Sequence, residues 1–331
     1  MNVIIFRFDR IGDFLVSSLL INNLKNKIGK TYFTVVCSDK NFSYIKNSKL
    51  VDKAILLPSN FFKRILFYFN FLGNKYDVAI VLDGKKKSII SSIFLNCSNK
   101  ILVTNKSFFK ILFKFFFNKI FYILPDDSKI FELKEVSKYL NYDFDDKNTK
   151  YTNRHNLVNK NITDLIKKID NYNILHFDEK WIFNDYIKSY VNIEPSKNDL
   201  LEFVKNLTMK SGIDLFITTG QCENHLINVL KSNFVQVDRN IHKLKINNRY
   251  LYIVDNINIF NLEYIISNSS LIVTCEGTPS HLANMYSKNL IAIIDKSEDR
   301  IFRNWTDHFT NYKLLNRCNF REISRKILEA L

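Results

Sequence analysis

The sequence predicts an α/β fold in which two parallel sheets are each flanked by helices. Short apolar stretches of four to six residues, rich in β-branched and aromatic side chains, alternate with longer stretches of helical spacing. The alternation begins again after a polar segment near the middle of the chain. Strands that are apolar on both faces and separated by helices are typical of doubly wound sheets. The chain is 46% hydrophobic, which excludes an intrinsically disordered protein.

The first half contains five expected strands and four expected helices. The strands are 3–6, 32–37, 53–57, 78–82 and 100–103. The helices are 14–26, 40–47, 61–72 and 88–95.

A polar stretch at 143–161, "DFDDKNTKYTNRHNLVNKN", is the expected linker. Beyond it the expected strands are 172–177, 214–218, 234–237, 250–254, 271–274 and 290–294, and the expected helices are 182–190, 199–210, 224–231, 260–267 and 279–286. The chain is therefore predicted to form two Rossmann-like domains, 1–150 and 151–331, with the last helix packed on its own domain or back on the first. Ligands of such sheets collect beyond the carboxyl ends of the strands.

The segment 107–124, "SFFKILFKFFFNKIFYIL", departs from this alternation. Lys110, Lys114 and Lys119 interrupt it, so it lacks the ~20 apolar residues of a spanning helix. As a helix it could lie in a lipid surface, with lysines on anionic head groups, or it could pack in the core with its lysines reaching outward.

The chain carries a formal net charge of +15, which predicts attraction to nucleic acid, anionic lipid or a phosphorylated substrate. A general excess of lysine and asparagine would give the same charge without any specific patch. The five cysteines are scattered and odd in number, which indicates reduced thiols and neither a zinc site nor a disulfide framework. No leading segment has the pattern of a signal peptide, so a cytoplasmic protein is expected.

Two common phosphate-binding motifs are absent from the sequence. Neither GxGxxG nor GxxxxGK[ST] occurs, which disfavours a dinucleotide-dependent oxidoreductase and a P-loop kinase. With seven glycines in the chain, phosphate binding is expected at a helix N-terminus or on basic side chains.

The first candidate loop lies in "IIFRFDRIGDFLVSS", where Gly12 and Asp13 follow the first strand. Gly12 would allow a sharp turn or a close approach to a ligand. Asp13 would lie in the first turn of a helix, where a carboxylate is stabilised by the helix dipole. It is either an ordinary N-terminal acid or a general base at the carboxyl end of a strand.

Two loops of the second half could hold an anion. In "HFDEKWIFNDY", Lys180 stands between a strand and a helix and could contact a phosphate, or belong to a solvated loop. In "VTCEGTPSHLANMY", Pro279 marks a helix start. Four backbone N–H groups are expected to be free to bind an anion there, those of Gly277, Thr278, Ser280 and His281. Glu276, beside them, could orient a group that carries a hydroxyl.

Two further loops carry weaker signals. In "ITTGQCEN", Glu223 could accept hydrogen bonds from ribose hydroxyls. In "RIFRNWTDH", Arg303 and Trp305 could contact a sugar and a phosphate, or be a surface arginine and a buried tryptophan.

Taken in order, these loops resemble the heptosyltransferases of glycosyltransferase family 9, enzymes of lipopolysaccharide core assembly. The resemblance spans nearly the whole chain and is carried by "IIFRFDRIGDFLVSSLLINNLK", "HFDEKWIFNDY", "ITTGQCEN" and "CEGTPSHLANMYSKNLIAII". It implies the GT-B architecture, two Rossmann-like domains facing across a cleft, with the acceptor on the first and a nucleotide-sugar, ADP-heptose or a related donor, on the second. It also implies inverting transfer without metal or cofactor onto a lipopolysaccharide core or similar lipid-linked glycan, and a place at the inner face of the cytoplasmic membrane.

The resemblance assigns roles to individual residues. Asp13 would be the base, with Gly12 and Arg10 on the acceptor side. The donor side would comprise Lys180, Glu223, Glu276, Gly277, Thr278, Ser280 and His281, with Trp305 and Arg303 as possible sugar contacts.

Two other hypotheses stay open, one because of departures from the family's pattern and one because of the positive charge. Glu276 replaces the usual Asp, Gly277 and Thr278 reverse the usual order, and Arg10 stands where Ser is common. A non-catalytic protein that binds nucleotide or glycan would fit these departures. Nucleic-acid binding by the basic surface ranks last, because no recognition motif accompanies the charge.

Overall fold

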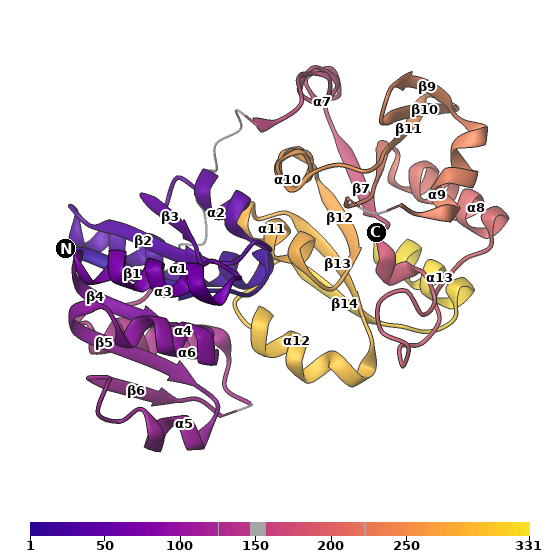
Figure 1. Ribbon diagram of the computed structural model, residues 1–331. Helices are drawn as coiled ribbons and strands as arrows, with labels where there is room; N and C mark the ends of the chain where they lie inside the picture. Colours follow the sequence, from indigo (N-terminus) through magenta and orange to yellow (C-terminus); the bar gives the residue numbers. More distant parts are fainter. Residues whose placement is uncertain (125, 146–156, 222) are drawn as a thin grey trace. The chain divides into compact units, whose positions relative to one another are not determined.

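The computed structural model describes residues 1–124, 126–145, 157–221 and 223–331 (Figure 1). The chain forms two compact units. Unit 1 comprises Met1–Arg154 and Arg303–His308, and unit 2 comprises His155–Phe302 and Phe309–Leu331. The main division falls within 146–156, so most of the expected linker lies outside the described residues. The return of 303–308 to unit 1 was not expected from the sequence.

Unit 1 contains a six-stranded parallel sheet in the order β3-β2-β1-β4-β5-β6, the order of Rossmann-type sheets. Its strands are β1 Asn2–Arg7, β2 Tyr32–Cys37, β3 Lys53–Leu56, β4 Lys75–Val81, β5 Asn96–Thr104 and β6 Lys119–Tyr122. The strand order reverses between β1 and β4, because β2 and β3 lie on one side of β1 while β4 to β6 lie on the other.

The helices of unit 1 are α1 Ile11–Ile28, α2 Phe42–Asn47, α3 Phe61–Leu72, α4 Lys86–Ile93, α5 Ser107–Leu112 and α6 Lys129–Tyr139. Right-handed crossovers place α3, α4 and α5 on one face of the sheet and α1 and α2 on the other. Side chains of α3, α4 and α5 accordingly pack into one apolar core with β1 and β4. α1 contacts α6.

Unit 2 contains an eight-stranded sheet in the order β14-β13-β12-β7-β8-β11-β10-β9. Its strands are β7 Tyr172–His176, β8 Asp214–Thr218, β9 Val235–Asp238, β10 Ile241–Ile246, β11 Arg249–Val254, β12 Leu271–Cys275, β13 Asn289–Ile294 and β14 Tyr312–Asn316. Six strands are parallel, and the β9–β10–β11 end is antiparallel. Here the strand order reverses between β7 and β12.

The helices after the first unit are α7 Lys160–Ile166, α8 Lys197–Ser211, α9 His225–Leu230, α10 Ile259–Asn268, α11 Thr278–Met285, α12 Asp299–Thr306 and α13 Phe320–Ala330, with short 3-10 turns η2 Glu179–Trp181, η3 Lys231–Asn233 and η4 Lys296–Glu298. The last helix, α13, packs on α8 and β14 within unit 2. The end of α12, and not the last helix, belongs to unit 1.

The structure confirms the predicted α/β class and corrects several elements. Residues 182–190, expected to be a helix, form turns, and Asn184 there has a positive φ of 66°. The segment 107–124 is not one helix, because α5 ends at Leu112 and the chain then turns into β6. The strands β6, β10 and β14 were not expected. No helix in the described ranges is long and apolar enough to span a membrane.

The packing of α13 leads to a stability prediction. Ile323 is fully buried against unit 2. Replacing Ile323 by Ala should lower the free energy of unfolding of unit 2 by about 2–5 kcal/mol, because it leaves a cavity in the core. Urea unfolding combined with amide hydrogen exchange would measure the loss and locate it in unit 2. The exposed neighbour Arg325→Ala should change little, and loss of protection in unit 1 alone would contradict the assignment of α13.

Candidate functional site

A buried arginine lies at the point where the first sheet reverses its strand order. Arg7 is the last residue of β1 and is only 5% exposed. Its Nη1 donates to the carbonyl oxygen of Leu82, 3.0 Å away after β4, and its Nε donates to the carbonyl oxygen of Asp13 at 3.3 Å. Ion pairs join its guanidinium to Asp9 at 3.5 Å and to Asp13 at 3.8 Å. Arg7 therefore ties both strands at the reversal to the first turn of α1.

Asp13 is held from two sides at the start of α1. Its Oδ2 accepts a hydrogen bond from the backbone N–H of Arg10 at 2.8 Å, which closes the N-terminal turn of the helix. Its Oδ1 lies 3.8 Å from Nη2 of Arg7, and 22% of its side chain is exposed. The carboxylate thus stabilises the start of α1 and is still accessible to solvent. The geometry is compatible both with an ordinary N-terminal acid and with a general base.

Gly12 lies within α1 and not in the loop before it, whereas Arg10 lies directly before the helix. Gly12 is a buried residue inside the first turn of α1, so it does not form the loop between strand and helix. That loop is 8–10. Arg10 immediately precedes the helix, and its side chain is exposed.

Two further carboxyl groups lie near Arg7. Asp83 accepts hydrogen bonds from the Phe8 N–H at 3.0 Å and from the Ser88 hydroxyl at 2.6 Å. Burial raises the pKa of Asp83, and these hydrogen bonds and Arg7 oppose the rise. Burial also raises the pKa of Glu132, against its ion pair with Lys129.

Trp305 belongs to this cluster of unit 1. The Arg7 guanidinium lies 5.8 Å from the centre of its ring, and the Lys129 ammonium lies 5.2 Å from it. The cations beside the tryptophan therefore come from β1 and α6, and Arg303 is exposed on α12. The short segment 303–308 thus places an aromatic ring beside Arg7, which forms an ion pair with Asp13.

In unit 2, the loop after β7 is built on a buried histidine. The Nδ1 of His176 lies 3.0 Å from the hydroxyl of Thr218, and its backbone carbonyl accepts a hydrogen bond from the Trp181 indole at 2.9 Å. Burial, followed by the charge of Lys180, lowers the pKa of His176 to about 3. His176 is therefore neutral and fixes the loop that carries Lys180.

Lys180 lies in η2, at the strand reversal of the second sheet, with only 9% of the residue exposed. Its ammonium donates a hydrogen bond to the carbonyl of Glu276, the residue after β12, and lies 3.9 Å from Oδ2 of Asp178. Burial alone would lower the pKa of Lys180, but the charges of Asp178 and Glu276 outweigh it and raise the pKa. The ammonium is therefore charged at neutral pH.

Gly277 makes room for that ammonium. Its φ of 137° and ψ of −158° lie in a region that is open essentially only to glycine. A Cβ at this position would also lie 2.5 Å from Nζ of Lys180. The lysine thus occupies the space that any other residue at 277 would fill.

The carboxylate of Glu276 lies near two cations, Lys180 and Arg317. Both its carboxylate oxygens are buried, and no other residue of the described ranges donates a hydrogen bond to them, while Nη2 of Arg317 lies 4.0 Å from Oε2. Burial raises the pKa of Glu276, and Lys180 and Arg317 oppose the rise. Buried carboxylates normally have donors, so these oxygens are suited to a ligand that brings hydroxyl groups.

Arg317, which follows β14, completes this cluster. Its Nη1 donates to the carbonyl oxygen of Lys180 at 2.9 Å, and its guanidinium lies 4.9 Å from the centre of the Tyr190 ring. It therefore holds the loop of Lys180 from the side of the last strand.

The N-terminus of α11 offers fewer free N–H groups than expected. The N–H groups of Ser280 and His281 both donate to the carbonyl of Gly277, at 3.1 and 3.5 Å, so the expectation that they are free is wrong. Within the described residues, the N–H groups of Gly277 and Thr278 donate to no backbone carbonyl outside regular helices and strands, and Pro279 has no N–H group. Ser280 is fully buried, and the ring of His281 packs edge-on against Phe309.

Glu223, predicted on the donor side, lies after β8, the strand next to β7. It is exposed in the loop between β8 and α9. Among the described residues it forms no ion pair with Lys180 or Arg317. Its neighbour Cys222 lies outside the described residues.

Two arginines at the centre of these clusters were missed at the level of sequence. Arg7 could have been found, because it is a charged residue at the end of an otherwise apolar strand, "VIIFR". Arg317 had no such signal, since β14 itself was not expected. Within the described ranges, no group of three or more His, Cys, Asp and Glu residues is arranged to hold a metal ion.

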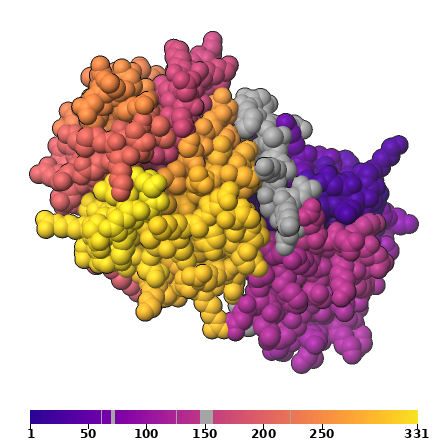
Figure 2. Space-filling model, turned by 180° about the vertical axis from the view of Figure 1, so that it is seen from behind, coloured from indigo at the N-terminus to yellow at the C-terminus, as the bar shows by residue number. Residues whose placement is uncertain are grey.

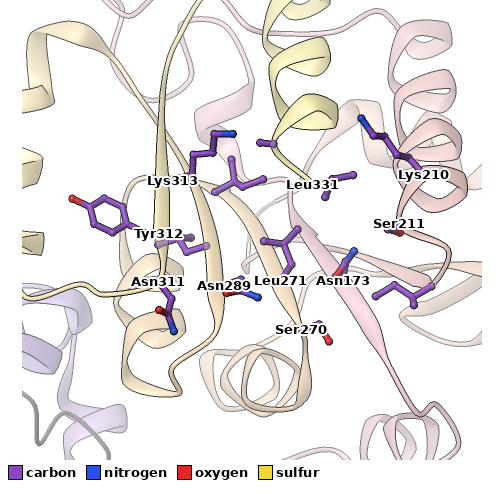
Figure 3. Close-up of a pocket in the computed structure, with 14 residues that line it drawn as sticks. Asn173, Lys210, Ser211, Ser270, Leu271, Asn289, Asn311, Tyr312, Lys313 and Leu331 are labelled. Atoms are coloured by element: carbon purple, nitrogen blue, oxygen red, sulfur yellow. The ribbon is translucent and has the colours of Figure 1, made fainter.

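Unit 2 also has a large pocket, which lies at the amino ends of its strands (Figure 3). It has a volume of about 530 Å³ and is lined by the first residues of several strands, including Leu271, Asn289 and Tyr312, with Leu331 beside them. Ligands of parallel sheets bind beyond the carboxyl ends, where Lys180 and Glu276 lie. The pocket is therefore not the candidate site.

The fold and the two charged clusters define an α/β protein of two Rossmann-like units, each with a buried cation where the strand order reverses. No family model matches the sequence, and no curated protein matches it. Solved structures do match the fold. The glycosyl transferase family 9 protein from Veillonella parvula DSM 2008 gives a TM-score of 0.69 at 10% identity, over 99% of this chain and 88% of that one.

Two Escherichia coli enzymes match equally well. Heptosyltransferase WaaC with ADP-2-deoxy-2-fluoro heptose gives a TM-score of 0.68 at 13% identity, over 100% of both chains. ADP-heptose lps heptosyltransferase II gives 0.67 at 12% identity, over 99% of this chain and 97% of that one. The chain therefore has the GT-B fold of these glycosyltransferases, and the fold that the sequence motifs predicted is confirmed.

The buried histidine leads to a prediction about pH. The unfolded chain takes up a proton on His176 below its ordinary pKa of 6.5, whereas the folded chain does so only near 3. Stability is therefore lost as the pH falls between these values, by about 1.4 kcal/mol per pH unit from this residue. Urea unfolding at several pH values should show a steeper acid loss for the natural chain than for His176→Gln. Equal slopes would contradict a neutral buried histidine.

Proposed function

We propose that this protein is an inverting, metal-independent glycosyltransferase that takes a sugar, heptose or a close relative, from a nucleoside-diphosphate donor, ADP-linked in the first instance. The acceptor we propose is a lipopolysaccharide core or a similar lipid-linked glycan. The observation that carries the proposal is the arrangement at the β7–β12 reversal, where the buried Lys180 ammonium lies in the space left free by Gly277 at the start of α11.

This arrangement is suited to a diphosphate. The Gly277 and Thr278 N–H groups and the positive end of the α11 dipole supply directed donors, and Lys180 supplies a full charge. When the sugar–phosphate bond breaks, negative charge grows on the departing diphosphate. Fixed positive groups stabilise that charge without reorganising, which is the main way in which such a site accelerates transfer.

The unsatisfied carboxylate of Glu276 fits the sugar part of the donor. Among the described residues, no other residue donates a hydrogen bond to its two oxygens, and hydroxyl groups of a bound sugar would supply such bonds. Glu223, exposed after β8, is proposed to accept from the ribose. His281 and Ser280 then support the turn from within the helix and make no direct contact through their N–H groups.

In unit 1 we assign Asp13 as the general base. The acceptor hydroxyl oxygen attacks the anomeric carbon as the bond from that carbon to the diphosphate breaks, and Asp13 takes the hydroxyl proton. Arg7 holds the carboxylate from one side, and the Arg10 N–H holds it from the other. Trp305 and Arg303 are proposed to line the acceptor side of this cluster.

This proposal also sets the place of the protein in the cell. Nucleotide-activated sugars are cytoplasmic substrates and the acceptor is lipid-linked, so we place the protein in the cytoplasm at the membrane surface. No nucleic-acid partner, metal or cofactor is part of the proposal.

The assignment of the base can be tested with Asp13→Asn. The amide oxygen can still accept the Arg10 N–H bond, so the helix start should survive, while the basic carboxylate is lost. Transfer should fall by about 10²–10⁴-fold with ADP binding unchanged. Product would be measured by mass spectrometry with ADP-heptose and truncated lipopolysaccharide acceptors.

The outcomes of this experiment separate the remaining hypotheses. Full transfer by Asp13→Asn would remove Asp13 as the base. Nucleotide binding by the natural chain with no product on a broad acceptor panel would favour a non-catalytic binding protein. Retention on DNA that is lost with salt, without any response to nucleotide-sugars, would favour the nucleic-acid hypothesis.

The donor loop can be tested with Gly277→Ala. The new Cβ would displace the Lys180 ammonium and strain the backbone, so ADP affinity should fall by at least about tenfold. Calorimetry would measure the affinity. A matched control is Gly212→Ala at the end of α8, which has a φ of 66° and open space around it. It should cost about 1 kcal/mol of stability and leave ADP binding intact. Equal loss of affinity in both variants would contradict the donor site.

A further inference from the structure

The helix α3 exposes a stripe of large apolar side chains. Phe62, Leu66 and Phe69 are 75%, 66% and 67% exposed. They are spaced four and three residues apart, so they lie along one face of the helix. Phe67 and Tyr68, on another face, pack against the core of unit 1. The exposed stripe therefore lies on a different face of α3 from the side chains that pack against this core.

The segment around α5 exposes a second apolar set. Phe108 and Ile111 are 65% and 75% exposed, and Phe115, in the turn after α5, is 92% exposed. Phe109 and Phe113 alternate with them and contact the core. The expectation of one long helix here is wrong, but the exposure of its aromatic residues is real.

Both sets lie in the same layer of unit 1. Right-handed crossovers place α3, α4 and α5 on one face of the sheet, and Figure 1 shows α5 beside β6 at the end of that sheet. Tyr68 of α3 stacks on Phe94 at the end of α4, with ring centres 5.2 Å apart, and Phe94 is itself 45% exposed. Figure 2 shows the purple and magenta part of the chain forming a broad surface of unit 1.

This layer also carries an unbalanced positive charge. The stretches 58–75 and 84–125 contain no Asp or Glu. Their basic residues are Lys63, Arg64, Lys75, Lys85, Lys86, Lys87, Lys100, Lys106, Lys110, Lys114 and Lys119. The whole chain, by comparison, has 33 acidic residues among 331, so the gap in acids is local.

We propose that α3, the end of α4 and the α5 segment form a surface that inserts its aromatic side chains into an anionic lipid bilayer. Apolar side chains among lysines match a membrane interface, where the rings enter the acyl boundary and the ammonium groups meet anionic head groups. A second copy of the chain would bring the same positive charge against it. Nucleic acid would pair with the lysines but leave the Phe and Leu side chains in water. The proposed function already places the protein at a membrane surface, and this inference rests on that proposal for the kind of partner while it names the side chains that would make the contact.

The test is co-sedimentation of the full chain with vesicles of phosphatidylcholine, with and without phosphatidylglycerol. The natural chain should bind the anionic vesicles, less strongly at high salt. The variants Phe62→Ser/Leu66→Ser/Phe69→Ser and Phe108→Ser/Ile111→Ser/Phe115→Ser should each weaken binding by at least about tenfold, because each removes apolar surface from the interface. All six side chains are exposed, so the fold should survive, which thermal unfolding would verify.

A matched control removes equally exposed apolar side chains from unit 2. Met209, Val235 and Val237 are 51%, 73% and 59% exposed, and their replacement by Ser should leave vesicle binding unchanged. In addition, Phe115→Trp would report insertion directly, since brominated lipids should quench the added fluorescence. Absence of vesicle binding, equal binding by all variants, or self-association abolished by the same triple variants would overturn the proposal. Vesicle binding without sugar transfer would leave it standing and remove only the proposed function.

Discussion

The structure depends on the reversal of strand order in each sheet. Where two neighbouring parallel strands send their connections to opposite faces, no helix covers their carboxyl ends, and backbone groups there must find other partners. Unit 1 meets this need with the Arg7 guanidinium, which bonds the carbonyl of Leu82 after β4. Unit 2 meets it with the Lys180 ammonium, which bonds the carbonyl of Glu276 after β12. In both units a buried cation bridges the gap and then attracts carboxylates.

A buried cation is costly unless it is paired, and this requirement shapes the loops around it. Lys180 has the Asp178 carboxylate on its own loop, and Arg317 holds the backbone of that loop from β14. Three segments far apart in the sequence are thus fixed by one charge. An anion that enters here meets a positive site whose geometry is already set, so little conformational freedom is lost on binding. The same reasoning applies to Arg7, which fixes Asp13 through its backbone and its carboxylate.

The sequence predicted what depends on local pattern. Apolar runs such as 32–37 and 214–218 were placed correctly, because a strand buried on both faces leaves a strong hydrophobic signal. The strands β10 and β14 are mostly only partly buried, so both lacked that signal. The residues 182–190 have apolar side chains at helical spacing, yet tertiary contacts hold them as turns against Arg317 and Lys180.

The site residues also divide into those that a local sequence pattern predicts and those that depend on the folded structure. Lys180, Glu276 and Gly277 could be proposed from motifs, since each stands directly after a predicted strand. Which N–H groups are free could not, because it depends on the φ of Gly277 and on where α11 begins. Nor could the membership of Trp305 in unit 1, since only the folded chain shows that 303–308 packs away from its sequence neighbours.

The departures at 276–278 acquire a physical meaning from this geometry. The glycine of this chain stands one position earlier than in the pattern it resembles, and the structure shows why it cannot move back: the residue at 277 has a φ of 137° and leaves its Cβ space to Lys180. A hydroxyl residue there would need another backbone conformation and another position for the ammonium. The longer side chain of Glu276, whose oxygens are buried beside Arg317, belongs to the same local change. Glycine, lysine and glutamate therefore form one coupled unit, so the diphosphate site that we propose could persist while the sugar of the donor differs.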